Sequence, residues 1–182
     1  NEQLAAKGQQ SKYYKGVRIT DAFTLDCALE AAGQLRYEIE AAFSQGLPNT
    51  PMAGATLRVI SGNFLTARPV GIVDGVDYRH SGQVRKIDTA LIQQLLDQGA
   101  IVLMSPMGFS PTGEAFNLTM ESVATAIASE LHAEKLLFLA EIEGIREKPL
   151  EPASPDNRLD TELSLADAER LMQQLPFPEQ PT

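Results

Sequence analysis

The longest regular pattern in the chain is a series of apolar residues spaced three or four positions apart between residues 22 and 43. This spacing places the apolar side chains on one face of an α-helix. Thr20 and Asp21 stand before the pattern as helix starters, and Gly46 and Pro48 end it. We therefore predict one long helix whose buried face is formed by Ala22, Leu25, Leu29, Ala32, Leu35, Ile39 and Phe43.

The pattern changes at residue 56 to short runs rich in β-branched residues, which are typical of strands. Gly62, Asn63 and Pro69 separate these runs, and Ser81–Gly82 is the expected turn of a following hairpin. The predicted strands are 56–61, 64–68 and 70–73, with a hairpin over 76–88.

Two units of a helix, a glycine and an apolar strand follow. Asp88 caps the first helix, Gly99 ends it, and the loop 106–114 separates the two units. The predicted helices are 90–97 and 119–131, and the predicted buried strands are 100–105 and 135–141. Successive helix–strand units indicate an α/β domain with a mainly parallel sheet, to which the hairpins add antiparallel pairs.

The two ends of the chain have weaker patterns. Residues 1–10 read as the last turns of a helix that stops at Gly8, within a domain predicted to extend over residues 1–145. Residues 146–160 are charged and proline-rich and predict a loop, 161–175 predict a terminal helix, and 176–182 predict a loose tail.

The composition narrows the possible functions. The 182 residues include 24 Asp and Glu against 15 Lys and Arg, a net charge of −9, which disfavours nucleic acid as a partner. A hydrophobic fraction of 43% argues against a disordered chain. The apolar runs are too short to cross a membrane, and no leader segment is evident. Cys27 is the single cysteine, which suits a reducing cytoplasm.

The loop after residue 105 is the first candidate site, because ligands of open α/β sheets bind beyond the carboxyl ends of the strands. It leads into a helix start, where backbone N–H groups favour an anion. Gly108 and Gly113 would allow close approach, and Asn117 stands just before the helix. An ordinary capping segment with turn glycines explains the same residues equally well.

Arg18 is the second candidate, since a guanidinium before a helix can clamp a carboxylate, although a surface pair with Asp21 is the simpler explanation. His80 and His132 lack the spacing of metal ligands, so no metal is expected. Glu121 fits a favourable helix dipole position. The residues alone indicate a pocket for a small anion and no reaction.

Five motifs follow one another along the chain: GVRITD before a long helix, SGNFL, VDYRHSGQVRKID, GAIVLMSPMGFSPTGEAFNLT and AEKLLFLAEIEGI. Their order resembles the amino-acid kinase fold, and within it the kinase-like domain of bacterial N-acetylglutamate synthases. The resemblance implies a three-layer αβα sandwich. It also implies that the family's first strand precedes residue 1, so that this chain is a fragment.

The resemblance assigns roles to four residues. Arg18 corresponds to the arginine that binds a carboxylate of the acylated glutamate in the related kinases. Asn117 corresponds to the first asparagine of their N-x-N-A-D motif, a substrate ligand. Thr119 and Glu121 replace the second asparagine and the aspartate of that motif, so the resemblance implies a retained pocket without kinase chemistry and no catalytic residue in this chain.

The resemblance further implies the function of a longer parent protein. Such synthases transfer an acetyl group from acetyl-CoA to L-glutamate in arginine biosynthesis, and their acetyltransferase domain lies downstream. Their kinase-like domain responds to L-arginine as feedback inhibitor and helps to form a homo-oligomer. The acetyl-CoA-binding motif is absent from this sequence, so we expect the chain to bind no cofactor and to be inactive alone.

Two other functions remain open from the sequence. A true N-acetylglutamate kinase would need Glu121 to act in place of an aspartate. A module that only binds a ligand or assembles an oligomer would need no catalytic group at all.

Overall fold

The computed structural model describes residues 2–45, 49–51, 53–139 and 162–174. The chain divides into two compact units, Asn1–Leu136 and Leu137–Thr182, and each is considered by itself. The first unit contains the helices α1 (Glu2–Ala6), α2 (Ala22–Ser44), α3 (Thr89–Asp97) and α4 (Met120–Glu130). Its strands are β1 (Lys12–Tyr14), β2 (Val17–Ile19), β3 (Val59–Ser61), β4 (Leu65–Pro69), β5 (Ile72–Val73), β6 (Val76–Asp77), β7 (Gly82–Ile87), β8 (Ile101–Leu103), β9 (Met107–Phe109) and β10 (Ala115–Asn117).

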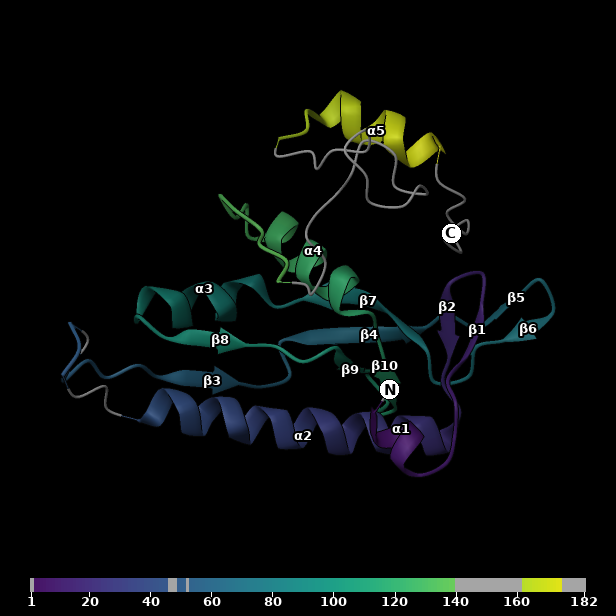
Figure 1. The fold of residues 1–182 in the computed structure, drawn as a ribbon, viewed down its shortest axis with the longest axis horizontal. Coiled ribbons are helices and arrows are strands. Elements are labelled where there is room, and N and C mark those ends of the chain that lie inside the picture. Colours follow the sequence, from purple (N-terminus) through teal and green to yellow (C-terminus); the bar gives the residue numbers. More distant parts are fainter. Residues whose placement is uncertain (1, 46–48, 52, 140–161, 175–182) are drawn as a thin grey trace, which may run out of the picture. The chain divides into compact units, whose positions relative to one another are not determined.

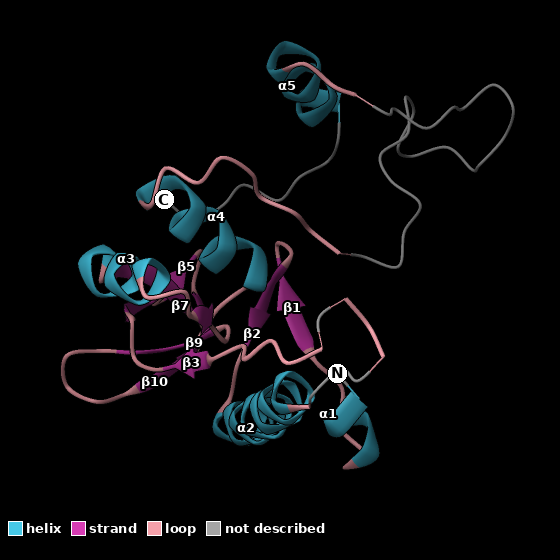
Figure 2. Cartoon of the chain, turned by 90° about the vertical axis from the view of Figure 1, so that its left-hand side faces the viewer, coloured by secondary structure: helices cyan, strands magenta, loops and turns pink. Residues whose placement is uncertain are grey.

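The first unit is a three-layer αβα arrangement, as the resemblance implies. The strands lie between α2 on one side and α3 with α4 on the other (Figure 1). The view turned by 90° shows α2 nearly end-on beneath the strands (Figure 2). The predicted class, a mixed α/β fold with parallel pairs and hairpins, is confirmed. The particular hairpin predicted over 76–88 is not formed, because β6 pairs with β5 and β7 pairs with β4.

The sheet is more antiparallel than the sequence pattern indicates. Four strands pair in the order β10-β9-β4-β7, and β3 pairs with β8. Among the strands described, the parallel pairs are β3–β8 and β4–β9, and the antiparallel pairs are β1–β2, β5–β6, β9–β10 and β4–β7. The first three antiparallel pairs are hairpins joined by short turns, whereas β4 and β7 are separated in the chain by the β5–β6 hairpin.

The core fills the space between the four-stranded sheet and the helices α3 and α4. Gly108 lies on the sheet in this core, where an added Cβ would be 2.6 Å from Leu65 Cδ1 and 2.7 Å from Ala67 Cβ. Only a glycine permits this close approach. The buried cluster comprises Phe64, Leu65, Ala67, Ile87, Ile92, Phe116, Leu118 and Val123.

The predicted helix starts are confirmed by side-chain caps. The Asp21 carboxylate accepts a hydrogen bond from Thr24 N at 2.8 Å, and Asp88 accepts one from Leu91 N at 3.1 Å. Each cap satisfies a backbone N–H group that has no partner within the helix. The sequence signals for α2 and α3 are therefore local, and they act as predicted.

The apolar stripe of α2 is buried only near its N-terminal end, contrary to the prediction of one continuous buried face. Leu25 and Cys27 are buried, whereas Leu35 is 55% exposed. A cavity of about 590 Å³ lies beside the middle of α2, so the neighbouring Ala31 and Leu35 line an open space and do not pack tightly.

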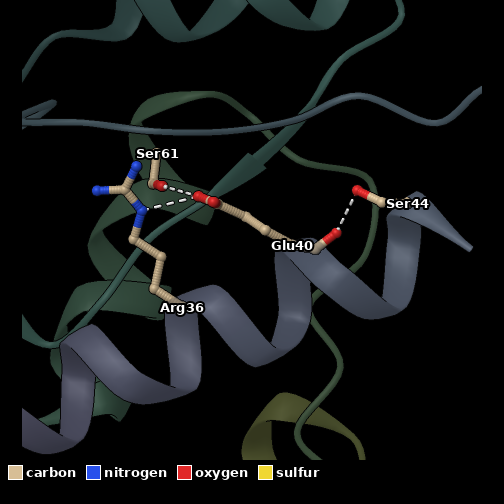
Figure 3. Close-up of polar contacts among 4 residues, drawn as sticks. All are labelled: Arg36, Glu40, Ser44 and Ser61. Atoms are coloured by element: carbon tan, nitrogen blue, oxygen red, sulfur yellow. Dashed lines mark hydrogen bonds and ion pairs between the residues drawn. The ribbon is translucent and has the colours of Figure 1, made fainter.

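A polar link joins α2 to β3 (Figure 3). Glu40 Oε1 accepts hydrogen bonds from Arg36 Nε at 2.7 Å and from Ser61 Oγ at 3.1 Å. The hydrogen bond from Arg36 is the main reason that the pKa of Glu40 lies below its usual value. Ser44 Oγ donates to the Glu40 carbonyl at 2.7 Å. One carboxylate thus connects the helix to the end of a parallel strand.

Three local predictions are wrong. The turn placed at Ser81–Gly82 lies at 74–75, between β5 and β6, and Ser81 is paired with Asn117 in a β-bridge. The loop 106–114 contains β9 and leads into a hairpin with β10. The strand predicted from residue 135 is not formed over 135–139, where Leu139 is 95% exposed, because no described strand lies beside it to form a ladder.

The second unit contains α5 (Leu165–Gln174), which agrees with the predicted terminal helix. Ser164 Oγ accepts a hydrogen bond from Asp167 N at 3.2 Å and so begins the helix as expected. The predicted loop 146–160 and tail 176–182 lie outside the described residues, as do residues 140–141 of the predicted strand. None of the helices in the described ranges has the length and apolar character that a membrane span needs.

Candidate functional site

A cavity of about 390 Å³ opens where three parts of the first unit meet. These parts are the β1–β2 hairpin, the start of β7 and the N-terminal end of α4. The lining residues are Tyr13, Gly16, Val17, Arg18, Thr20, Ser81, Gly82, Asn117, Leu118, Thr119, Met120 and Glu121. Four of the six residues singled out from the sequence are therefore brought together, although they come from opposite ends of the unit.

Arg18 lies on β2, and its position is set by Tyr13 on the paired strand β1. Arg18 Nη2 donates to the Tyr13 hydroxyl at 2.8 Å, and the guanidinium lies 5.4 Å from the centre of the Tyr13 ring. A guanidinium carries five N–H donors in a planar fork, so it can hold a tyrosine and a carboxylate together. Asp21, the alternative partner considered for Arg18, is the cap of α2.

The Asp21 carboxylate is held in its ionised form by this cap. The hydrogen bond from the Thr24 backbone is the main reason that the pKa of Asp21 lies below its usual value. The carboxylate is thus occupied at the helix end, close in sequence to the cavity but not among the residues that line it.

Asn117 ends β10 and faces the same cavity from the other side. Its backbone N–H donates to the His80 carbonyl at 2.9 Å, and its Nδ2 donates to Thr20 Oγ1 at 3.2 Å. These bonds join β10 to the segment before β7 and to the end of β2. Asn117 and Arg18 thus line the same cavity, from β10 and β2 respectively.

Thr119 and Glu121 form the α4 side of the cavity. Thr119 Oγ1 accepts a hydrogen bond from Ser122 N at 3.3 Å and so serves as the N-cap of α4. Glu121 lies in the first turn of this helix. The helix N-terminus favours an anionic ligand group, whereas the Glu121 carboxylate already offsets part of that positive potential.

Gly108 and Gly113 are not among the residues that line the cavity. Gly108 contacts the buried cluster on β9, and Gly113 lies in the turn between β9 and β10, where its N–H donates to the Ser110 carbonyl at 3.0 Å. Both glycines serve the hairpin, one through close packing and the other through a φ of +89°. The expected anion-binding loop is thus a hairpin whose far end, Asn117, reaches the cavity.

The sequence analysis does not single out eight of the twelve lining residues, and three of these eight, Tyr13, Thr20 and Ser81, carry hydroxyl groups. Thr20 is predicted as part of a helix start and Ser81 as part of a turn. Their polar side chains in otherwise extended segments were the available signal, but only the tertiary contacts show that they meet.

No cluster of three or more His, Cys, Asp or Glu side chains suited to a metal occurs among the residues the structure describes. Cys27 is buried in α2, as its apolar role predicts.

The fold and the site together define an α/β domain with a cavity lined by Arg18, Asn117, Thr119 and Glu121. Comparison with known proteins agrees with this class. The family model described as "Amino acid kinase family" matches residues 2–176. The chain belongs to the amino acid kinase family.

The curated relatives of this chain have names that are more specific than the family description. The amino-acid acetyltransferase of Ralstonia nicotianae is 55% identical over 171 residues, which are 93% of this chain and 36% of that protein. A relative of the same name from Pseudomonas fluorescens is 53% identical over 142 residues, which are 78% of this chain and 33% of that protein. The chain thus spans about a third of the length of these relatives.

Solved structures give the same picture. N-acetylglutamate synthase from Neisseria gonorrhoeae, complexed with coenzyme A and L-arginine, matches with a TM-score of 0.83 at 38% identity, covering 94% of this chain and 38% of that chain. The same enzyme complexed with coenzyme A and N-acetylglutamate matches with a TM-score of 0.78 at 39% identity, covering 94% of this chain and 37% of that chain.

Proposed function

We propose that this chain is the kinase-like domain of an N-acetylglutamate synthase and that its cavity binds an acylated or free glutamate. The observation that carries the proposal is the meeting of Arg18 and Asn117 in one cavity beside the N-terminus of α4. Similarity to proteins named amino-acid acetyltransferase supports the choice of parent enzyme.

The whole enzyme would transfer the acetyl group of acetyl-CoA to the amino nitrogen of L-glutamate. The thioester bond breaks, an amide bond forms, and coenzyme A leaves as the thiol. The chain in hand would not catalyse this step, because its sequence lacks the acetyl-CoA-binding motif that the resemblance assigns to a separate domain. Release of coenzyme A from acetyl-CoA and glutamate by this chain alone would contradict the assignment.

Further properties of the parent enzyme belong to the same proposal. These are a role in arginine biosynthesis, inhibition by L-arginine, assembly into a homo-oligomer and a cytoplasmic location. The complex of the Neisseria synthase with L-arginine supports the choice of inhibitor.

Arg18 would bind a carboxylate of the ligand, and Asn117 would bind a neighbouring polar group. The proposal is tested by titration calorimetry of the chain with N-acetyl-L-glutamate, L-glutamate and L-arginine. A charge-assisted hydrogen bond contributes about 1.5–3 kcal/mol, so Arg18→Ala is expected to weaken binding of N-acetyl-L-glutamate about 10- to 100-fold. Arg85→Ala removes an exposed arginine of β7 that does not line the cavity and is expected to bind as the unaltered chain does.

Two results would contradict the binding proposal. One is the absence of heat with N-acetyl-L-glutamate for a folded chain. The other is an equal loss of affinity in Arg18→Ala and Arg85→Ala, which would show that the arginine of the cavity has no special role.

A kinase is the second candidate, because a carboxylate, Glu121, does line the cavity. The capping bond from Ser122 N, however, engages the Thr119 hydroxyl, which stands where the kinases have an asparagine. We therefore expect no phosphorylation of N-acetyl-L-glutamate by ATP. Formation of the acyl phosphate, trapped with hydroxylamine, would favour the kinase instead.

A further inference from the structure

A chain of hydrogen bonds through the buried side chains of Thr20 and Ser81 runs along the wall of the cavity, from the Arg18 carbonyl to the Asn117 side chain. Thr20 is 0% exposed and Ser81 is 3% exposed. Ser81 Oγ is hydrogen-bonded to the Arg18 carbonyl, lies 2.9 Å from Thr20 Oγ1, and accepts from Thr20 N at 3.1 Å. Thr20 Oγ1 in turn lies 3.2 Å from Asn117 Nδ2. Buried hydroxyl groups in such a chain must all be satisfied, since an unpaired one is costly.

The number of available protons fixes the direction of this chain. The Arg18 carbonyl can only accept, so the single proton of the Ser81 hydroxyl must point to it. The heavy-atom positions of the 2.9 Å contact fit Ser81 as the donor to Thr20. Ser81 has one hydroxyl proton, however, and its 2.5 Å contact with the Arg18 carbonyl uses that proton, so we assign the proton between Ser81 and Thr20 to the Thr20 hydroxyl. With both hydroxyl protons used, the contact between Thr20 and Asn117 can be a hydrogen bond only if Asn117 supplies the proton from Nδ2.

The two ends of the Asn117 amide are therefore not equivalent. If the amide were rotated by 180°, its oxygen and Thr20 Oγ1 would face each other with no proton between them. The Thr20 hydroxyl could supply that proton only if Ser81 donated to Thr20 instead, and the hydrogen bond from Ser81 to the Arg18 carbonyl would then be lost. With Nδ2 directed to Thr20, the carbonyl oxygen Oδ1 is the atom left for a ligand. Oδ1 enters no hydrogen bond among the residues that the structure describes.

We infer that Thr20 and Ser81 are positioning residues that hold the Asn117 amide with its oxygen as the hydrogen-bond acceptor of the cavity. This inference rests on the proposed function, because the cavity then combines a cationic donor, Arg18, with a neutral acceptor, Asn117. Such a pair selects a ligand that has an N–H group beside a carboxylate. N-acetyl-L-glutamate has both groups, and glutarate has the carboxylates without the N–H group.

Thr20→Val and Thr20→Ser form the matched test. Valine keeps the size of threonine and removes the hydroxyl, whereas serine keeps the hydroxyl and removes a methyl group. In the unaltered chain and in Thr20→Ser, calorimetry is expected to give at least tenfold tighter binding of N-acetyl-L-glutamate than of glutarate. In Thr20→Val this preference is expected to fall to less than threefold, because the amide is free to rotate.

The preference is a ratio of two affinities in one variant, so a general loss of stability does not change it. A second measurement needs no ligand. The side-chain N–H₂ signals of Asn117, assigned by their loss in Asn117→Ala, are expected to shift and to exchange faster with water in Thr20→Val than in Thr20→Ser. If Thr20→Val does not fold, Ser81→Ala carries the same two measurements, since it removes the oxygen that accepts the Thr20 hydroxyl proton.

The inference is overturned if Thr20→Val keeps both the tenfold preference and the Asn117 signals of the unaltered chain. If the unaltered chain binds neither compound, the proposed function fails. The Asn117 signals alone then decide whether Thr20 and Ser81 position the amide.

Discussion

Gly82 offers a sharp test of the structure, because it lines the cavity and also contacts β10. A Cβ added at Gly82 would lie 2.5 Å from Phe116 Cβ and 3.2 Å from the Arg68 carbonyl oxygen. Carbon atoms in good contact are about 3.5–4.0 Å apart, so Gly82→Ala overlaps Phe116 by roughly 1 Å or more. Neither neighbour can rotate away, since one is a backbone atom and the other is bonded directly to the backbone.

The expected cost follows from two opposing effects. Forcing one extra carbon into a packed site costs about 1–3 kcal/mol. Replacing glycine restricts the unfolded chain and returns about 0.4–1 kcal/mol. We expect Gly82→Ala to lower the free energy of unfolding by about 1–2 kcal/mol, which corresponds to a loss of about 2–4 °C in Tm per kcal/mol for a chain of this size.

Gly33→Ala is the matched control. Gly33 lies inside α2, and no other group lies within 4 Å of its added Cβ. Alanine is favoured over glycine in a helix by about 1 kcal/mol, so this variant is expected to raise the urea midpoint while Gly82→Ala lowers it. A Gly82→Ala variant as stable as Gly33→Ala would refute the close approach of β7 and β10.

Three further outcomes are expected. Asp21→Ala removes the cap of α2 and is expected to lower the free energy of unfolding by about 1 kcal/mol. Asp21→Asn keeps a hydrogen-bond acceptor, so its free energy of unfolding is expected to fall by less. Equal decreases in the two variants, measured by urea unfolding, would contradict the capping role. The pKa of Asp21 is lowered in the folded state, so the ionised carboxylate stabilises the fold above the usual carboxyl pKa, and this stabilisation is lost as the pH falls through the lowered value. Asp21→Asn is therefore expected to flatten the acid side of the curve of unfolding free energy against pH. An unchanged curve would contradict this expectation. Burial raises the pKa of Tyr78, whose hydroxyl donates to the Tyr14 carbonyl at 3.1 Å. Titration followed by tyrosinate absorbance is expected to show one tyrosine that ionises at higher pH than the others, and Tyr78→Phe is expected to lack it. A late-ionising tyrosine that remains in Tyr78→Phe would contradict the assignment.

The elements that could be predicted from the sequence are those whose signals are local. The helix α2 has its cap, Asp21, its apolar spacing and its stop within one continuous segment, and α3 follows the same rule from Asp88. The parallel character of β8 could also be predicted, because an apolar run after a helix favours a parallel strand, whereas its partner β3 could not be identified from that run.

The elements that were predicted wrongly depend on distant partners. Ser81 has the composition of a turn, yet it is buried by contacts with Thr20 and Asn117, which lie far away in the sequence. The segment 135–139 has the composition of a strand but has no described neighbour to pair with. The amino-acid composition of a segment indicates which structure it can form, but a strand or turn forms only where the rest of the fold provides the segments with which it pairs.

The charges around the cavity bear on the choice between binding and phosphoryl transfer. Among its lining residues in the described part of the chain, Arg18 carries a positive charge and Glu121 a negative one. A single carboxylate bound at Arg18 meets one cation and the N-terminus of α4. ATP would bring several negative charges, and phosphoryl transfer requires cations and donors arranged around them. On this charge balance we expect the site to bind a small carboxylate ligand in preference to a nucleoside triphosphate, and therefore to bind its ligand without phosphoryl transfer.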